Sequence, residues 1–196
     1  LLQWWEPITS SDSEEADDAR FAHFGNEGPG DPKFSSCAVS EALRKAGFPV
    51  SGSAEPNRSG LFLNDGTGNF SNATAELGLP LDEIVAFTGS FADIDGDGWQ
   101  DLAITGDYCT SRVFRNVGGT GFEDITQQAG VATDENGMSS VMSDIDRDGD
   151  PDWFVTSISY PSKDERPIQS GSGNRLFVND GTGRFTDATD DYGLRD

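Results

Sequence analysis

Short apolar runs alternate with glycine- and aspartate-rich segments over the last two-thirds of the chain. The runs "DLAIT" (101–105) and "DWFVTSI" (152–158) are rich in β-branched and aromatic residues, which favour strands. Between the runs lie turn-forming segments such as "NDGTG", whose glycines can adopt positive φ angles. The pattern therefore predicts many short strands joined by tight turns.

Two of these segments recur along the chain in a fixed order. The segment "LFLNDGTGNFSNATAELGL" (61–79) returns as "VFRNVGGTGFEDITQQAGV" (113–131) and as "LFVNDGTGRFTDATDDYGL" (176–194). The segment "SFADIDGDGWQDLAIT" (90–105) returns as "VMSDIDRDGDPDWFVT" (141–156). Because two distinct motifs alternate in the same order, the sequence contains an internal repeat.

Each repeat unit reads as four short strands, one on either side of the aspartates and one on either side of the "NDGTG" turn. The chain holds half a unit at about 61–74, a full unit at about 87–126 and a second full unit at about 138–189. A four-stranded antiparallel unit of this length is typical of a propeller blade. We therefore predict a mainly all-β fold, a partial β-propeller of about 2.5 four-stranded blades. The polar insertion at 160–173 is expected to be a surface loop.

Residues 1–59 do not show the repeat and are treated as an N-terminal segment, with 60–196 as the repeat region. This segment is predicted to hold loops and one helix at about 37–46, which Gly47 and Pro49 end. Its apolar start, "LLQWW", is expected to dock on a neighbouring copy of the chain.

The formal net charge of −22 restricts the partners of the protein. Nucleic acid is excluded because phosphate binding needs a basic face. Membrane insertion is not expected, since no apolar run approaches the ~18 residues that a spanning helix needs. The acidic excess is instead compatible with cation binding.

Two aspartate-rich loops carry the candidate chemistry. Each follows D-x-D-x-D-G-x-x-D, so that four carboxylates occupy positions 1, 3, 5 and 9 of one loop. Without a cation these charges would repel one another. Ca²⁺ takes about six to eight oxygen ligands, whereas Mg²⁺ usually keeps several waters. The glycine at position 6 (Gly98, Gly149) permits the sharp turn, and the carbonyl at position 7 (Trp99, Asp150) can point inward as a further ligand.

An EF-hand shares the first half of this pattern but needs a glutamate at position 12 and flanking helices. Position 12 is Ile104 in one loop and Val155 in the other, and both flanks are predicted strands. The EF-hand is therefore excluded. An acidic turn that binds no ion is the other alternative, and the recurrence of the pattern with the same period argues against it.

Aspartate loops inside strand pairs, followed by "NRLFVNDGTGRFTDATDDYGL" (174–194), resemble the FG-GAP/VCBS repeats of integrin-α-type β-propellers, especially those that accompany ASPIC/UnbV proteins. The resemblance covers roughly residues 60–196. It implies one Ca²⁺ in each loop, two per chain. The implied ligands are Asp93, Asp95, Asp97, the Trp99 carbonyl and Asp101 in the first loop, and Asp144, Asp146, Asp148, the Asp150 carbonyl and Asp152 in the second. Arg147 departs from the small residue usual at position 4 and is expected to point outward.

The resemblance also implies an extracellular or cell-surface interaction module and no enzyme. The module would act in adhesion, protein–protein interaction or self-assembly, with a filament subunit as one form, because 2.5 blades leave strand edges unpaired. Its expected partners are calcium and either other copies of itself or the rest of a longer propeller. Two alternatives remain open: a glycan-binding module that uses Trp99 and Trp153 as platforms, or an accessory fragment of a secreted polysaccharide-active enzyme. Both tryptophans lie in a loop or at the start of a strand, where packing alone would also account for them.

Three further features bear on the cellular location and on catalysis. Cys37 and Cys109 could form one disulfide or remain two buried thiols. The sequons at Asn57, Asn69 and Asn72 would accept glycans in a secretory pathway, so the protein could be a glycoprotein. The one histidine, His23, lies between aromatic residues and is expected to be packed rather than catalytic.

Overall fold

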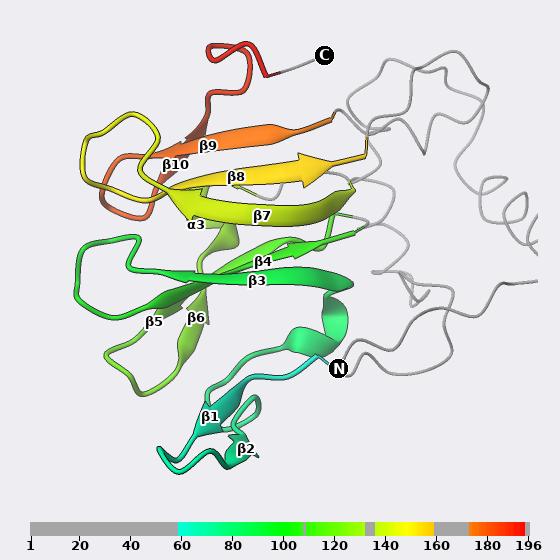
Figure 1. Cartoon of the computed structure of the whole chain (residues 1–196), viewed down its shortest axis with the longest axis vertical. Coiled ribbons are helices and arrows are strands. Elements are labelled where there is room, and N and C mark those ends of the chain that lie inside the picture. The colour runs from blue at the N-terminus through cyan, green and yellow to red at the C-terminus, as the bar shows by residue number, and fades with distance from the viewer. Residues whose placement is uncertain (1–58, 108, 132–135, 159–172, 195–196) are drawn as a thin grey trace, which may run out of the picture. The chain divides into compact units, whose positions relative to one another are not determined.

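A computed structural model of the chain describes residues 59–107, 109–131, 136–158 and 173–194 (Figure 1). The chain divides into two compact units, and all the described residues belong to the second, Lys33–Asp196. The predicted helix at about 37–46, the apolar start and His23 lie outside the described residues. So does the insertion at 160–173, apart from its last residue.

The described strands form three antiparallel sheets, each made of strands that are consecutive in the sequence. The first is a hairpin of β1 (Phe62–Asn64) and β2 (Phe70–Asn72). The second is formed by β3 (Ala86–Ala92), β4 (Asp101–Gly106), β5 (Arg112–Asn116) and β6 (Phe122–Asp124). The third is formed by β7 (Gly137–Ser143), β8 (Asp152–Ser157), β9 (Arg175–Asn179) and β10 (Phe185–Asp187). The predicted half unit and two full units of a mainly β, partial propeller are confirmed.

Every unit closes in the same way after its last strand. A threonine hydroxyl just beyond that strand accepts a hydrogen bond from a backbone N–H in, or directly before, the unit's third strand, at 2.8–3.0 Å. The three threonines are Thr74, Thr126 and Thr189. In the first full unit this closure forms the short helix α3 (Thr126–Ala129), and a 3₁₀ turn, η2 (Leu81–Glu83), precedes β3. Neither of these short helices was predicted from the sequence.

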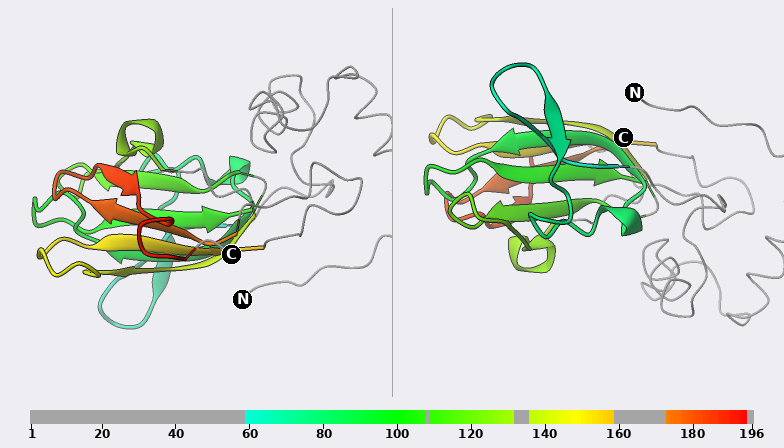
Figure 2. Two further views of the ribbon diagram at one scale, coloured as in Figure 1. Left: turned by 90° about the horizontal axis from the view of Figure 1, so that it is seen from above. Right: turned by 90° about the horizontal axis from the view of Figure 1, so that it is seen from below.

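The two four-stranded sheets pack against each other through one face of each (Figures 1 and 2). Ala103 and Val113 of the first sheet meet Trp153 and Phe177 of the second in a single buried cluster. The Trp153 and Phe177 rings are tilted, with their centroids 5.7 Å apart. This apolar contact holds the two units together, because burying such side chains is the main favourable contribution to folding.

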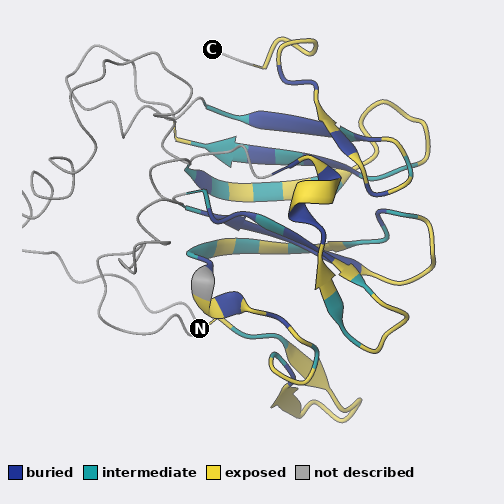
Figure 3. Ribbon diagram, turned by 180° about the vertical axis from the view of Figure 1, so that it is seen from behind, coloured by how far each residue is buried: buried dark blue, intermediate teal, exposed yellow. Residues whose placement is uncertain are grey.

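The opposite face of the first sheet is only partly covered. Leu79, Leu81 and Ile84, which follow the β1–β2 hairpin, form a second buried cluster with residues of β4 and β5. The backbone N–H of Phe122 in β6 donates to the Leu77 carbonyl at 2.9 Å. The hairpin itself is exposed along both strands (Figure 3).

Candidate metal centres

The two aspartate-rich loops join the first and second strands of each full unit and lie at the same end of the two sheets (Figure 1). The last aspartate of each loop, Asp101 or Asp152, is the first residue of the second strand. Its position is therefore fixed by the strand ladder, while the earlier aspartates belong to the loop that returns toward it.

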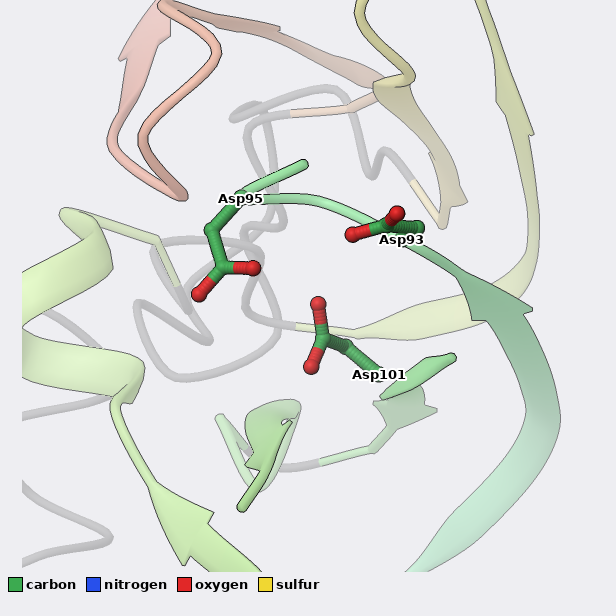
Figure 4. Close-up of side chains that lie close together, drawn as sticks. All are labelled: Asp93, Asp95 and Asp101. Atoms are coloured by element: carbon green, nitrogen blue, oxygen red, sulfur yellow. The ribbon is translucent and has the colours of Figure 1, made fainter. Parts of the chain in front are cut away.

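The first loop brings three carboxylates together. Asp93, Asp95 and Asp101 each offer an oxygen, and these three oxygens lie within 4.8 Å of one another. The carboxylate groups face a common space (Figure 4). Asp101 is buried, and its two oxygens accept hydrogen bonds from the backbone N–H groups of Ile94 (2.9 Å) and Asn116 (2.7 Å). These bonds hold the Asp101 carboxylate in one orientation.

The second loop repeats this arrangement with equivalent residues. Oxygens of Asp144, Asp146 and Asp152 lie within 4.8 Å of one another. Asp152 is buried and accepts hydrogen bonds from the backbone N–H groups of Ile145 (2.8 Å) and Asn179 (2.9 Å). The same carboxylates and the same backbone donors thus recur in both units.

The aspartates at position 5 play a different part in the structure. Asp97 and Asp148 are not members of the two carboxylate triplets. Each accepts a hydrogen bond from the backbone N–H at position 7, at 2.8 Å from Trp99 and 3.0 Å from Asp150. The ligand roles of Asp97, Asp148 and the carbonyls of Trp99 and Asp150 stay predictions.

The tight turn of each loop depends on positive φ angles at positions 4 and 6. Gly98 and Gly149 have φ angles of 90° and 105°, a region that favours glycine. Position 4 is also left-handed, with Gly96 at 72° and Arg147 at 69°. The Arg147 side chain is exposed, as its expected outward orientation requires. A bulky residue in this region carries a backbone cost that Gly96 avoids.

The electrostatics of both triplets favour a bound cation. Burial raises the pKa of the Asp101 carboxyl, the hydrogen bonds from Asn116 and Ile94 oppose that rise, and the charges of Asp95 and Asp97 add to it. The pKa of Asp146 is also raised, by desolvation and by the neighbouring carboxylates of Asp148 and Asp152. Gathering these charges therefore costs free energy that a positive ion would offset. A donor set of carboxylate oxygens alone fits a hard cation such as Ca²⁺.

The first loop also touches the following unit. The Asn179 side chain donates from Nδ2 to the Ile94 carbonyl at 2.8 Å and to the Pro151 carbonyl at 3.2 Å. A Cβ atom at Gly183 would lie 3.6 Å from the Asp95 Cβ, so the β9–β10 turn lies against the loop. This contact was not predicted from the sequence, because it joins residues 85 positions apart. The recurrence of this asparagine in every "NDGTG"-type segment was the available signal.

The two tryptophans proposed as glycan platforms differ in exposure. Trp153 is completely buried between the sheets, so the prediction that it forms a glycan-binding platform is wrong. The cause is its place at the start of β8, on the face that packs against the first sheet. Trp99 is exposed, and its ring packs so closely over Gly119 that a Cβ atom there would collide with it.

Cys109 is disulfide-bonded, which decides between the two states considered for this residue. It lies in the connection between β4 and β5. The chain has one other cysteine, Cys37, which lies outside the described residues.

Comparison with protein families identifies the class to which these units belong. The profile of the FG-GAP-like repeat matches residues 50–104 and again residues 93–155, together just over half of the chain. The chain therefore belongs to the FG-GAP-like repeat family. The narrower likeness to repeats of ASPIC/UnbV proteins stays a prediction. A search of curated proteins gave no match.

Membership of the family carries several general properties. FG-GAP repeats form interaction or adhesion modules that are generally not catalytic, often bind Ca²⁺ and are typical of extracellular proteins. Among the described residues, no helix is long and apolar enough to cross a membrane.

Proposed function

We propose that this chain is an extracellular interaction module, not an enzyme, whose two full repeat units each bind one Ca²⁺. The observation that carries the proposal is the repeated triplet: Asp93, Asp95 and Asp101 in one unit, and their equivalents 51 residues later, converge within 4.8 Å. One acidic turn could arise for other reasons. Two triplets with equivalent backbone donors are best explained if each binds the same kind of ion.

The triplets would let an ion connect the first strands of each unit. Asp93 and Asp95 lie in the loop after β3, while Asp101 begins β4 and is hydrogen-bonded to the backbone of Asn116 at the end of β5. When bound, Ca²⁺ supplies the positive charge that the three carboxylates share. The chain's own part is to hold the loop, β4 and β5 in the register that makes the oxygens converge.

An extracellular location fits both the chemistry and the cysteine. Extracellular calcium modules bind with dissociation constants of about 10⁻⁴–10⁻³ M, a range suited to exposed loops with few fixed ligands. Disulfides persist mainly in oxidising compartments, and Cys109 forms a disulfide. Adhesion, protein–protein interaction and self-assembly are the roles that such a module would serve. The glycan-binding alternative loses its main support with the burial of Trp153.

Thermal melting in calcium and in chelator tests the metal part of this proposal. Asp95→Ala and Asp146→Ala each remove one triplet member, so each should lower the melting temperature in calcium and change it much less in chelator. At a calcium concentration tenfold above Kd, one site adds about 1–2 kcal/mol to the free energy of unfolding. Asp82→Asn, an exposed acidic position outside both loops, serves as the control. Equal losses in calcium and chelator would contradict the proposal.

A further inference from the structure

The two ends of the described stack of units expose apolar positions that its middle buries. Between the two sheets, Ile94, Ala129 and Val131 are at most 7% exposed. Their equivalents in the last unit are Ile145, Tyr192 and Leu194, which are 38%, 46% and 36% exposed. These three residues, which lie in the β7–β8 loop and after β10, together with Val141 of β7 (51% exposed), are called the tail face.

The other end carries the complementary half of the same contact. Phe177 and Phe185 of the last unit pack in the buried cluster with Ile94, Ala129 and Val131. The residues equivalent to these two phenylalanines in the first half unit are Phe62 and Phe70, which are 52% and 64% exposed. The β1–β2 hairpin that bears them is called the head hairpin (Figure 3).

We propose that the tail face binds the head hairpin of a second copy of this chain, so that copies join head to tail. The contact would place Phe62 and Phe70 of one copy against Ile145, Tyr192 and Leu194 of the next. This inference names the partner surface for the self-assembly role of the proposed function and rests on that role.

The internal contact between units supplies the template for this pairing. It combines an aromatic pair from one unit with an isoleucine from the aspartate loop and apolar residues after the last strand of the unit before it. At the junction before the first sheet, the Phe122 N–H donates to the Leu77 carbonyl at 2.9 Å. By repeat position, the corresponding groups at the ends are the Phe70 N–H and the Tyr192 carbonyl.

A second copy fits the tail face because every copy already carries both halves of the contact. A two-stranded hairpin is marginal by itself in water, so docking would also stabilise β1 and β2. The two surfaces differ, which makes the contact heterologous and lets copies add in series. Ile145 lies within the second aspartate loop, so calcium that orders this loop would also favour docking. The net charge of −22 opposes association, and salt should therefore strengthen it.

Complementary variants of the full chain test the proposal by light scattering after size exclusion in millimolar calcium. Phe70→Glu blocks the head hairpin and Leu194→Glu blocks the tail face; each variant alone should be monomeric, whereas the wild-type chain assembles. An equimolar mixture of the two should form one-to-one dimers, because one free tail face meets one free head hairpin. Leu63→Glu is the matched control. It is exposed on β1, its equivalent in the first full unit is Arg115, and it should assemble like the wild-type chain.

Several outcomes would overturn the inference. The first is a wild-type chain that stays monomeric at about 100 µM in calcium. The second is a mixture of the two variants that forms no dimer. The third is assembly that is lost when residues 1–6 are deleted but is kept in Phe70→Glu. Calorimetric titration of the same samples separates the two proposals. A monomeric chain that binds two calcium ions refutes the head-to-tail contact alone, and an assembled chain that binds none refutes the calcium sites alone.

Discussion

At the scale of single residues, position 4 of the two aspartate loops allows the free-energy cost of a left-handed backbone to be measured. Arg147 is held at a φ of 69°, where the equivalent residue of the first loop is Gly96. We expect Arg147→Gly to be more stable than Arg147→Ala by about 1 kcal/mol, since both remove the charge and only glycine relieves the left-handed strain. Chemical denaturation of both variants in calcium measures this difference. Equal stabilities would show that the loop imposes no such strain.

The charge at Asp146 should act in opposite directions with and without calcium. Its pKa is raised in the folded chain, first by desolvation and then by Asp148 and Asp152. A carboxyl whose folded-state pKa is raised costs stability when it is charged, and this cost disappears as the pH falls through that pKa. In chelator, Asp146→Asn should therefore raise the melting temperature at neutral pH, with a gain that shrinks toward about pH 4.

In calcium the same substitution removes a charged member of the triplet and should lower the melting temperature. Asparagine keeps a side-chain oxygen for the backbone N–H of Asp148, which donates to Asp146 at 3.2 Å, so the loop turn is preserved. Melting curves over this pH range, in calcium and in chelator, provide the comparison. A shift of the same sign in both media would contradict a cation shared by the triplet.

At the scale of loops and sheets, two equivalent isoleucines allow a matched comparison. Ile94 is 1% exposed within the cluster between the sheets, whereas Ile145 is 38% exposed. Ile94→Ala should cost about 2–5 kcal/mol, because it leaves a cavity in a packed core. Ile145→Ala should change stability by less than about 0.5 kcal/mol in monomeric protein, and the Phe70→Glu background provides that state. Denaturant unfolding that gives similar losses for both would refute the packing of the two sheets described here.

The elements were predictable from sequence where the signal was local. The segments "RVFRN" and "RLFVN" coincide with β5 and β9, since each has consecutive apolar residues shortly before a turn-forming asparagine. Three of the four carboxylates in each loop converge, because their spacing and the position-6 glycine determine the turn. The recurrence of Asn179 in each unit was visible in the sequence, but its contact with the first loop was not predicted, and the sequence did not distinguish burial of Trp153 from a binding role. Both depend on how one unit packs on the next, which no local pattern encodes.

At the scale of the whole molecule, the repeat units behave as stacked layers, each covered by the next. The described stack begins with a half unit and ends with the β7–β10 sheet, and both ends expose aromatic or aliphatic residues. Proteins normally cover or pair such surfaces. Docking of the apolar start "LLQWW" on a neighbouring copy would be a second way to cover such a surface. It stays a proposal, since these residues lie outside the described part of the chain.

The most direct test of calcium-stabilised FG-GAP units is a calorimetric titration of the wild-type chain with calcium and, separately, with magnesium. We expect two calcium ions per chain, because the triplets of the two units are built alike. Asp101→Ala and Asp152→Ala should each reduce the number to one. Magnesium should bind much more weakly, since it retains its waters and requires a stricter geometry. A titration that shows no calcium binding would contradict the existence of these sites, and equal binding of the two ions would contradict their selectivity for calcium.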